Sequence, residues 1–474
     1  MLRVAAPLIV LLLAGCSASP PGGSLMVAVA GEDAAAAGMA DQLAAEASEA
    51  TLITRGANGE LAPGLATSWR FLDSGSDLIL RLAPVRWPAA AVGQGRELSA
   101  RDVVGSLQRT PRRHRAALQA AGLAGRGTAR APIARVVELS PRPATPYLLD
   151  WLAEPALAVR GRRGTAFPGP YAARREAGAW QLTRRSDVPQ PGARAAAISI
   201  TPLPADKAIA EFAAGRVPLV LGAGLAGLGA ARASGQGRAV RIEAVNGVIG
   251  LSIRPDGALA DPRLRRALLL AADGAPLANR VALAALVPQN RLWPDLPPPA
   301  DARAQPLAAR RGEAIRLLAA AGYGPQRPLR LVLLVPAAAD WHQLADALAT
   351  SLAPTGIEIA IGRAGRAAGR HDLALAEVTA LLPDVLAHLA AWRCGRVRPC
   401  SAAADRQLAA AAQAGSDAPR RLALAAAAEA ELMADPAFVP LLRPVRWALV
   451  SSRISGFAAN PLGRHPVARM ATGE

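Results

Sequence analysis

The chain has 474 residues, a formal net charge of +18 at pH 7 and 52% hydrophobic residues. The hydrophobic residues are mostly alanine and leucine, which favours helix-rich α/β structure over an all-β fold. Among the 54 basic residues only Lys207 is a lysine. The positive charges are scattered, and the densest run, residues 109–115, has no interleaved aromatic residues, so we expect no nucleic-acid partner.

The first sixteen residues have the order of a secretory signal. Arg3 gives a basic start, and the apolar residues 4–13 that follow are too few to span a bilayer, which takes roughly 20 residues. The run ends in Leu13-Ala14-Gly15-Cys16, which resembles a bacterial lipoprotein signal. That resemblance implies cleavage before Cys16 and lipidation of its thiol. The protein would then be lipid-anchored to a bacterial membrane in the periplasmic space. An ordinary signal peptide with a chance cysteine is the alternative.

Strands and helices alternate in the first part of the mature chain. Residues 25–30 form a compact apolar run and predict a buried strand, residues 34–50 predict a helix, and residues 78–82 predict a second strand. Ser99 and Asp102 have the spacing of a capping box, which indicates that another helix begins at this point. Residues 160–195 are rich in Gly, Pro and Arg and contain few apolar runs.

The second half continues the alternation. The pattern predicts helices over residues 262–272, 310–321 and 341–352, a strand over 329–335, a long connector over 290–306 and one or two alanine-rich helices over 402–434. Strands that alternate with helices are typical of α/β proteins with mixed or parallel sheets. We find no internal repeat.

Two cysteines remain besides Cys16. Cys394 and Cys400 can close a small loop as a disulfide in an oxidising compartment. The five histidines are dispersed and form no His-Glu-x-x-His pattern, so we expect no metal site.

A glycine motif supplies a competing hypothesis. Gly222-x-Gly224-x-x-Gly227 follows an apolar run, and Glu243 ends the next apolar run. This is the dinucleotide fingerprint, in which glycines approach a pyrophosphate and the acid binds the ribose hydroxyls. The alternative function is therefore an exported oxidoreductase that binds FAD or NAD. Residues 234–237 leave room only for a short helix, and the motif lies deep in the chain, so we expect no cofactor.

Ordered motifs run through most of the chain, from about residue 52 to 465. They are Gly59-Glu-Leu-Ala-Pro-Gly-Leu-Ala-Thr-Ser-Trp69, residues 80–87 and 95–104, Phe167-Pro-Gly-Pro-Tyr171, residues 261–273, residues 310–323, and Gly456-Phe457 with Asn460. Taken together, they resemble the periplasmic solute-binding proteins of dipeptide, oligopeptide and nickel ABC transporters.

The resemblance implies a two-lobed α/β fold of the periplasmic-binding-protein type, with mixed sheets, a hinge between the lobes and an extra subdomain in lobe one. The expected parts are a signal peptide (1–15), a tether (16–24), lobe one (25–248, with the subdomain at about 64–165), lobe two (249–439) and a C-terminal return to lobe one (440–474). Such a protein captures a peptide-like or other small solute in the interlobe cleft and delivers it to a membrane permease. It catalyses no reaction, and we expect a monomer.

The resemblance also indicates a ligand pocket. The segment it points to offers Glu377, Asp384, Trp392 and Arg393. In peptide-binding members an aspartate three residues before an Asp-Pro pair holds the α-amino group of the ligand. Asp384 matches the Asp of that pair, and Leu381 occupies the position three before it. Unless Glu377 substitutes, we expect weak binding of ordinary free peptides, and an anionic or capped ligand suits Arg393 better. In the alternative interpretation, Trp392 is core and Arg393 is surface.

Overall fold

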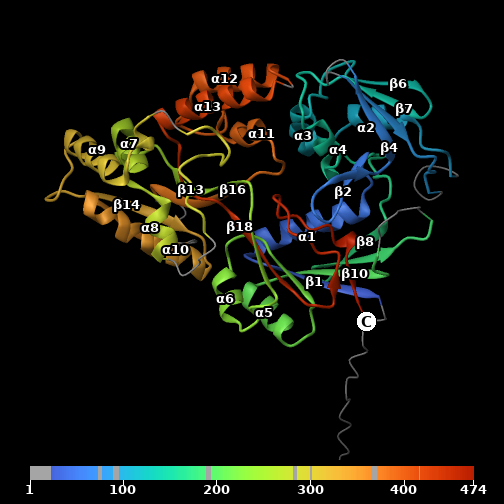
Figure 1. The fold of residues 1–474 in the computed structure, drawn as a ribbon, viewed down its shortest axis with the longest axis horizontal. Helices are drawn as coiled ribbons and strands as arrows, with labels where there is room; N and C mark the ends of the chain where they lie inside the picture. Colours follow the sequence, from blue (N-terminus) through green and yellow to red (C-terminus); the bar gives the residue numbers. More distant parts are fainter. Residues whose placement is uncertain are drawn as a thin grey trace, which may run out of the picture.

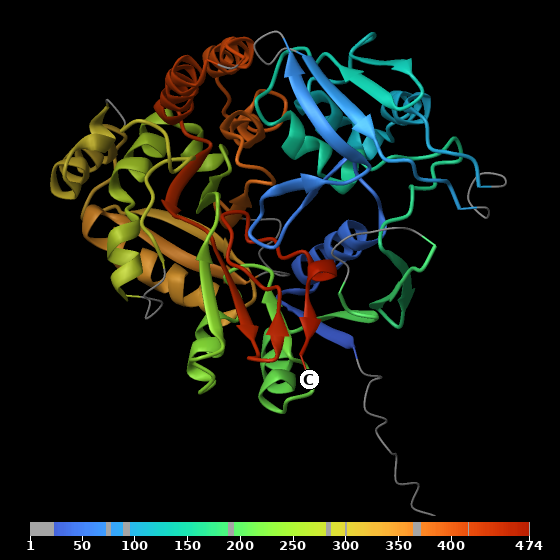
Figure 2. The same ribbon diagram turned by 45° about the vertical axis from the view of Figure 1, so that its right-hand side comes forward.

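The structure, a computed structural model, describes residues 23–72, 77–88, 95–187, 194–280, 286–298, 301–363, 371–415 and 417–473. These residues form two α/β lobes and a subdomain attached to lobe one. The subdomain lies at the upper right of Figure 1 and is seen from another side in Figure 2. Cys16 and the predicted signal peptide lie outside the described residues. Within the described chain, no helix is both long and apolar enough to span a membrane.

Lobe one is built on a sheet that has seven strands in the described chain. In order across the sheet they are β12 (Val240–Ala244), β18 (Val445–Val450), β11 (Leu219–Gly222), β1 (Ser24–Ala30), β10 (Ala197–Leu203), β9 (Ala179–Arg184) and β8 (Tyr171–Glu176). β1 is parallel to β10 and β11, whereas β18 is antiparallel to β11 and β12. The sheet is therefore mixed, as predicted.

The strand period of two explains how lobe one is covered on both faces. Leu25, Val27 and Val29 of β1 pack in the cluster that includes the buried face of α1 (Asp33–Ser48). Ala28 and Ala30 point to the opposite face, into the cluster that includes residues of α5 (Ala205–Ala213) and α6 (Leu228–Ala233). That second cluster continues without a break into the core of lobe two.

Lobe two is also a layered α/β unit. Its sheet has the order β15 (Ile357–Arg363), β14 (Leu329–Val335), β16 (Leu373–Thr379), β13 (Gly247–Ile253) and β17 (Phe438–Leu442). Its helices are α7 (Pro262–Ala271), α8 (Gly274–Arg280), α9 (Leu307–Ala320), α10 (Ala339–Leu352), α11 (Val385–Leu389), α12 (Ala402–Gln413) and α13 (Ala418–Ala434). The alanine-rich region therefore forms two helices, which pack against each other.

The subdomain has a core of its own. Its sheet has the order β4 (Ala66–Leu72), β5 (Asp77–Leu82), β7 (Val136–Leu139) and β6 (Ala129–Ile133), and its helices are α2 (Ala100–Gln108), α3 (Arg115–Ala120) and α4 (Leu148–Leu152). The small strand pairs β2 (Ile53–Arg55) with β3 (Leu61–Pro63) and β19 (Ile454–Ser455) with β20 (Ala471–Thr472) complete the lobe-one side.

Short 3₁₀ turns connect several of these elements. They are η2 (Arg112–His114), η3 (Pro155–Leu157), η4 (Gly257–Ala260), η5 (Ala302–Ala304), η6 (Ala353–Thr355), η7 (Ala390–Trp392) and η8 (Val467–Arg469).

The chain crosses between the lobes at one place. β12 of lobe one leads into β13 of lobe two, and β17 leads back into β18. The two crossings lie side by side, because Val245 N donates to the carbonyl of Pro444 (2.9 Å). Arg443 strengthens the contact by donating from Nε to the Val245 carbonyl and from Nη2 to Asn246 Oδ1, each at 3.1 Å. This pair of segments is the hinge.

The strongest local patterns gave the right elements. The predicted strand at 25–30 is β1, and the helix at 341–352 is the larger part of α10. The Arg- and Gly-rich stretch 160–195 holds a hairpin, β8 with β9, that its composition did not indicate. Its strands carry exposed arginines on both faces of the hairpin (Arg174, Arg175 and Arg184), which hides the usual apolar alternation.

The predicted capping box is present at the start of α2. Asp102 Oδ2 accepts hydrogen bonds from Ser99 N (2.9 Å) and Ser99 Oγ (2.8 Å), and Arg96 donates to both carboxylate oxygens at 2.7 and 2.6 Å. Burial opposes ionisation of this carboxyl, but the hydrogen bonds from Arg96 and Ser99 outweigh it and lower the pKa of Asp102 to about 2.

We expect Asp102→Asn to lower the free energy of unfolding by about 1 kcal/mol at pH 6, because it removes the charge that binds Ser99 N and Arg96 in the capping box. The folded-state pKa lies below the ordinary value of 3.8, so this contribution is complete above that value and is lost as the pH falls through about 2. Urea unfolding of both proteins between pH 6 and pH 2 measures it. Glu97→Gln, an exposed neighbour, is the control, and a difference that does not shrink toward pH 2 would contradict the prediction.

Candidate functional site between the lobes

The glycine motif lies in the loop from β11 to α6, at the end of the lobe-one sheet that faces lobe two. A Cβ atom on Gly222 would lie 2.4 Å from the ring of Trp447, so the ring requires a glycine there. Gly227 has φ +85°, and a Cβ atom on it would lie 2.4 Å from Ala205 Cβ. Trp447 Nε1 also donates to the carbonyl of Ala226 (3.1 Å). Close packing therefore accounts for these two glycines.

A side chain of lobe two binds the backbone of this loop. Asp340, in the first turn of α10, accepts hydrogen bonds from Gly227 N (2.7 Å) and Gly229 N (2.9 Å). Asp340 is only 5% exposed. Free N–H groups at a helix start are the groups that would bind a phosphate in a dinucleotide fold. Here the chain's own carboxylate occupies them.

Glu243 is not placed as the acid of a dinucleotide site. β18 lies between β11 and β12 and runs antiparallel to both, so the two strands of the motif are not neighbours. Glu243 is buried, accepts a hydrogen bond from Asn460 N (3.4 Å) and lies 3.5 Å from His465 Nε2. Burial raises the pKa of Glu243 to about 7 and lowers the pKa of His465 to about 4. The alternative of an FAD- or NAD-binding oxidoreductase is therefore not supported.

Two further polar contacts cross between the lobes. Glu377 on β16 of lobe two pairs with Arg446 on β18 of lobe one, at 2.5 Å between Oε1 and Nη1. Glu32, just before α1, accepts a hydrogen bond from Ala338 N of lobe two (3.0 Å). Glu377 also reaches the glycine loop, because its Oε2 lies 3.3 Å from the place of a Cβ on Gly224. The lobes are thus in direct contact on this side.

Arg464 connects three parts of the molecule. Its guanidinium pairs with Glu46 of α1, donates to Glu154 of the subdomain (2.7 Å) and donates to the Leu381 carbonyl of lobe two (3.4 Å). Burial alone would lower the pKa of Arg464, but the carboxylates of Glu46 and Glu154 outweigh it and raise that pKa. Leu382, the next residue of lobe two, packs in the core of the subdomain. The loop that carries Leu381 is therefore fixed against lobe one.

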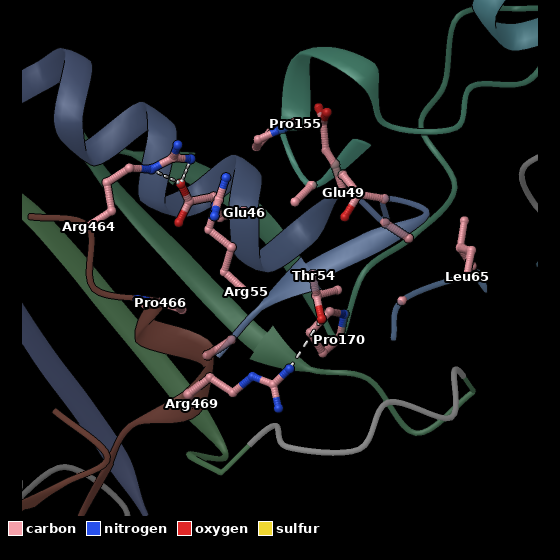
Figure 3. Close-up of a pocket in the computed structure, with 15 residues that line it drawn as sticks. Glu46, Glu49, Thr54, Arg55, Leu65, Pro155, Pro170, Arg464, Pro466 and Arg469 are labelled. Atoms are coloured by element: carbon pink, nitrogen blue, oxygen red, sulfur yellow. Dashed lines mark hydrogen bonds and ion pairs between the residues drawn. The ribbon is translucent and has the colours of Figure 1, made fainter. Parts of the chain in front are cut away.

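A cavity of about 80 Å³ lies beside Arg464 (Figure 3). In this view Arg464 turns toward Glu46, and Arg469 reaches Thr54, to which it donates at 3.3 Å. All residues that line the cavity belong to lobe one and its subdomain. Clefts for drug-sized ligands measure roughly 300–1,000 Å³. This cavity is therefore too small for a peptide and does not lie between the lobes.

The other predicted site residues make contacts inside lobe two. Asp384 is 6% exposed and caps α11, accepting from Leu386 N (2.9 Å) and Ala387 N (3.3 Å). Burial raises the pKa of Asp384. Trp392 is 4% exposed, and its ring packs against His388 and Phe438, with centroids 5.1 and 5.6 Å apart. The structure thus places Trp392 in a packing role and Asp384 in a capping role, whereas Glu377 contacts lobe one through Arg446.

Arg393 and the two cysteines follow directly after this aromatic cluster. Arg393 is half-buried, and its Nε has no hydrogen-bond partner. Cys394 and Cys400 are joined in a disulfide. Among the described residues, no group of three or more His, Cys, Asp or Glu side chains could hold a metal ion.

Sequence reasoning missed most of the interlobe residues. Asp340, Arg446 and Arg464 carry no local signal, because their partners lie 113, 69 and 418 residues away along the chain. In a chain with so many arginines, nothing in the sequence distinguishes Arg446 or Arg464 from the rest. The glycine motif did mark a loop that contacts lobe two, and the partner of that loop is the carboxylate of Asp340.

The family follows from a sequence comparison. Residues 60–395 match the model of the bacterial extracellular solute-binding proteins, family 5 (middle region). The match covers more than half of the chain and runs from lobe one through the hinge into lobe two. The chain belongs to this family. The resemblance drawn from the ordered motifs is therefore confirmed. None of the curated proteins matches the chain.

Solved structures have the same fold. Haemophilus influenzae OppA in complex with the peptide RPPGFSPFR superposes with a TM-score of 0.79 at 16% identity, covering 96% of this chain and 99% of that one. The Escherichia coli murein tripeptide binding protein MppA gives 0.80 at 19% identity, again covering 96% and 99%. The unliganded open form of MppA gives only 0.66 at 19% identity, with 95% and 98% covered. The direct contacts between the lobes show that this chain is in a closed arrangement.

We expect Asp340→Ala to shift the protein from the closed toward an open arrangement of the lobes. The substitution leaves Gly227 N and Gly229 N without acceptors when the lobes are closed, and each buried unpaired group costs about 1–3 kcal/mol. Opening exposes both groups to water, so the open population should grow and the radius of gyration in X-ray scattering should increase. Asp346→Ala, on the exposed face of the same helix, is the control. Identical scattering from both variants would contradict the prediction.

Proposed function

We propose that this protein is the substrate-binding component of an ABC importer. It captures a small solute between its lobes and presents the closed form to a membrane permease, without making or breaking a bond. The observation that carries the proposal is the family match, which continues through the hinge from lobe one into lobe two. The hinge also supports this proposal, because two adjacent crossings allow one lobe to rotate away from the other and open the cleft between them.

The proposed ligand site is the interlobe surface at the glycine loop. In the closed form Glu377 pairs there with Arg446, and Glu32 accepts a hydrogen bond from Ala338 N of lobe two. On opening, these groups lose their partners and become available to a solute. A ligand that offers both a donor and an acceptor can replace the Glu377–Arg446 contact, which makes Glu377 a ligand-binding residue in the open form.

We propose a peptide-like or other small solute as the ligand. The similar structures include a periplasmic oligopeptide-binding protein and a murein tripeptide binding protein, which supports a peptide-like class. Leu381, at the position that resembles the amine-binding aspartate, is apolar and 43% exposed. A free α-amino group would therefore gain no ion pair from this residue. An anionic or amine-blocked ligand fits better, with Arg393 as the candidate contact for its negative group.

Binding of matched peptides tests this specificity. We expect a free tripeptide and its N-acetylated form to give similar, small thermal shifts with the natural protein. Leu381→Asp should strengthen binding of the free tripeptide about tenfold, because it supplies the missing carboxylate. Ile133→Asp, which adds a carboxylate to an exposed side chain of the subdomain, is the matched control. Tight binding of the free tripeptide by the natural protein, lost on acetylation, would refute the specificity but not the family.

The N-terminal cysteine is the proposed point of attachment to the membrane. The support is the order of charge, apolar run and Leu-Ala-Gly-Cys before Cys16, together with a family of extracellular solute-binding proteins. Lipidation of Cys16 would keep the protein in the periplasmic space beside its permease.

We expect Cys16→Ser to prevent lipidation. The variant should stay as an uncut precursor or leave the membrane as a soluble form, because the acylated thiol is absent. Mass spectrometry of the N-terminal peptide and detergent-phase partition of the natural and variant proteins measure this. If the natural protein carries no acyl chains, or if the variant partitions with detergent as the natural protein does, the proposal that Cys16 is a lipid anchor is wrong.

A further inference from the structure

The sheet of lobe one has two functionally different ends. One end carries Ala30, Gly222 and Ala244 and faces lobe two. We define the distal end as the opposite one. It carries Ser24 of β1, Leu219 of β11, Val240 of β12, Val450 of β18, Ala197 of β10 and Arg184 of β9. The proposed ligand site lies at the first end, and the distal end lies outside it.

The distal end is strongly basic. Five exposed arginines gather around it: Arg184, Arg194, Arg238, Arg241 and Arg453. Within the described chain none of them forms an ion pair, since the nearby acids Asp187 and Glu211 pair with Arg185 and Arg216. Arg241 donates to the backbone carbonyls of Arg238 and Val240, contacts that leave its charge uncompensated.

Three of these arginines surround a hollow of about 1150 Å³. Arg238, Arg241 and Arg453 line it together with the hydroxyl-bearing Ser451 and Ser452. The rest of the wall is largely apolar, from Phe212, Val217, Pro218, Val450, Ile454 and Phe457, and none of the lining residues is acidic. Guanidinium groups match the geometry of phosphate oxygens, and apolar walls match hydrocarbon. The lining suits a phosphate that is attached to an apolar body.

The chain enters lobe one beside this hollow. Thr472 Oγ1 donates to the carbonyl of Ser24 (2.7 Å), and Gly473 N donates to the carbonyl of Arg453 (2.7 Å). The first strand and the C-terminus accordingly lie together in Figure 1. Residues 16–23 reach at most about 3.5 Å each, roughly 28 Å in all. A lipid on Cys16 would therefore hold the distal end within about that distance of the bilayer.

We propose that the distal hollow binds the headgroup of an anionic phospholipid, so that lobe one docks on the membrane by its distal end. The proposal rests on the lipid anchor proposed above, which supplies the proximity. Arg238, Arg241 and Arg453 bind the phosphate, and the apolar wall contacts the glycerol and upper acyl carbons. Glu474, which follows Gly473, is acidic and lies outside the described residues.

Vesicle binding tests the proposal without the anchor. The chain from Ser17 onward contains every described residue, and we compare it with the triple variant Arg238→Gln, Arg241→Gln, Arg453→Gln. The probes are vesicles of phosphatidylcholine with and without phosphatidylglycerol. We expect sedimentation only with phosphatidylglycerol, weakening with salt, and a loss of about fivefold for each arginine, or about 100-fold for the triple variant.

A matched variant separates the site from net charge. Arg126→Gln, Arg130→Gln, Arg135→Gln removes three exposed arginines of the subdomain and should keep vesicle binding. Equal losses in both triple variants would overturn the proposal, as would binding of glycerol phosphate without binding of vesicles. Thermal unfolding verifies that the variants fold. If natural protein lacks acyl chains but the chain from Ser17 binds vesicles through these arginines, the anchor fails and the headgroup site stands.

Discussion

The two lobes are covalently joined at one place, and this constraint shapes the rest of the molecule. β12 passes into β13 and β17 passes back into β18, with Arg443 fastening the two crossings to each other. The polar contacts between the lobes in the described chain include Asp340 with the glycine loop, Glu377 with Arg446, Glu32 with Ala338 N, and Arg464 with the Leu381 carbonyl, and all of these are non-covalent. They can break together when lobe two turns about the hinge, which is the motion that solute capture requires.

The sequence predicted the elements whose signals are local. Residues 25–30 and 329–335 are short apolar runs with clear boundaries, and both are strands. The site was harder, because a carboxylate that caps a helix and one that binds a ligand look alike in sequence. Asp384 turned out to cap α11 and Trp392 to fill the core of lobe two, whereas Asp340 holds the lobes together. Such roles depend on partners that only the folded chain brings near.

The dinucleotide fingerprint shows how one local pattern can serve a different purpose. Glycines after a buried strand allow any group to approach the backbone N–H groups at a helix start. In this fold, Trp447 packs against Gly222, and a carboxylate of lobe two binds Gly227 and Gly229. The same geometry that receives a phosphate in other proteins receives a neighbouring lobe here. Strand order distinguishes the two cases, since β18 separates the strands that a dinucleotide site needs side by side.

The position of β18 also sets the order in which the protein can fold. Residues 445–450 lie between β11 and β12, so the sheet of lobe one stays in two pieces until almost the whole chain is available. Contacts this distant in sequence form slowly, because the chain loses entropy on closing a long loop before the new contacts stabilise it. Until β18 is made, β12 has no neighbour in the sheet of lobe one, and that sheet cannot reach its final strand order.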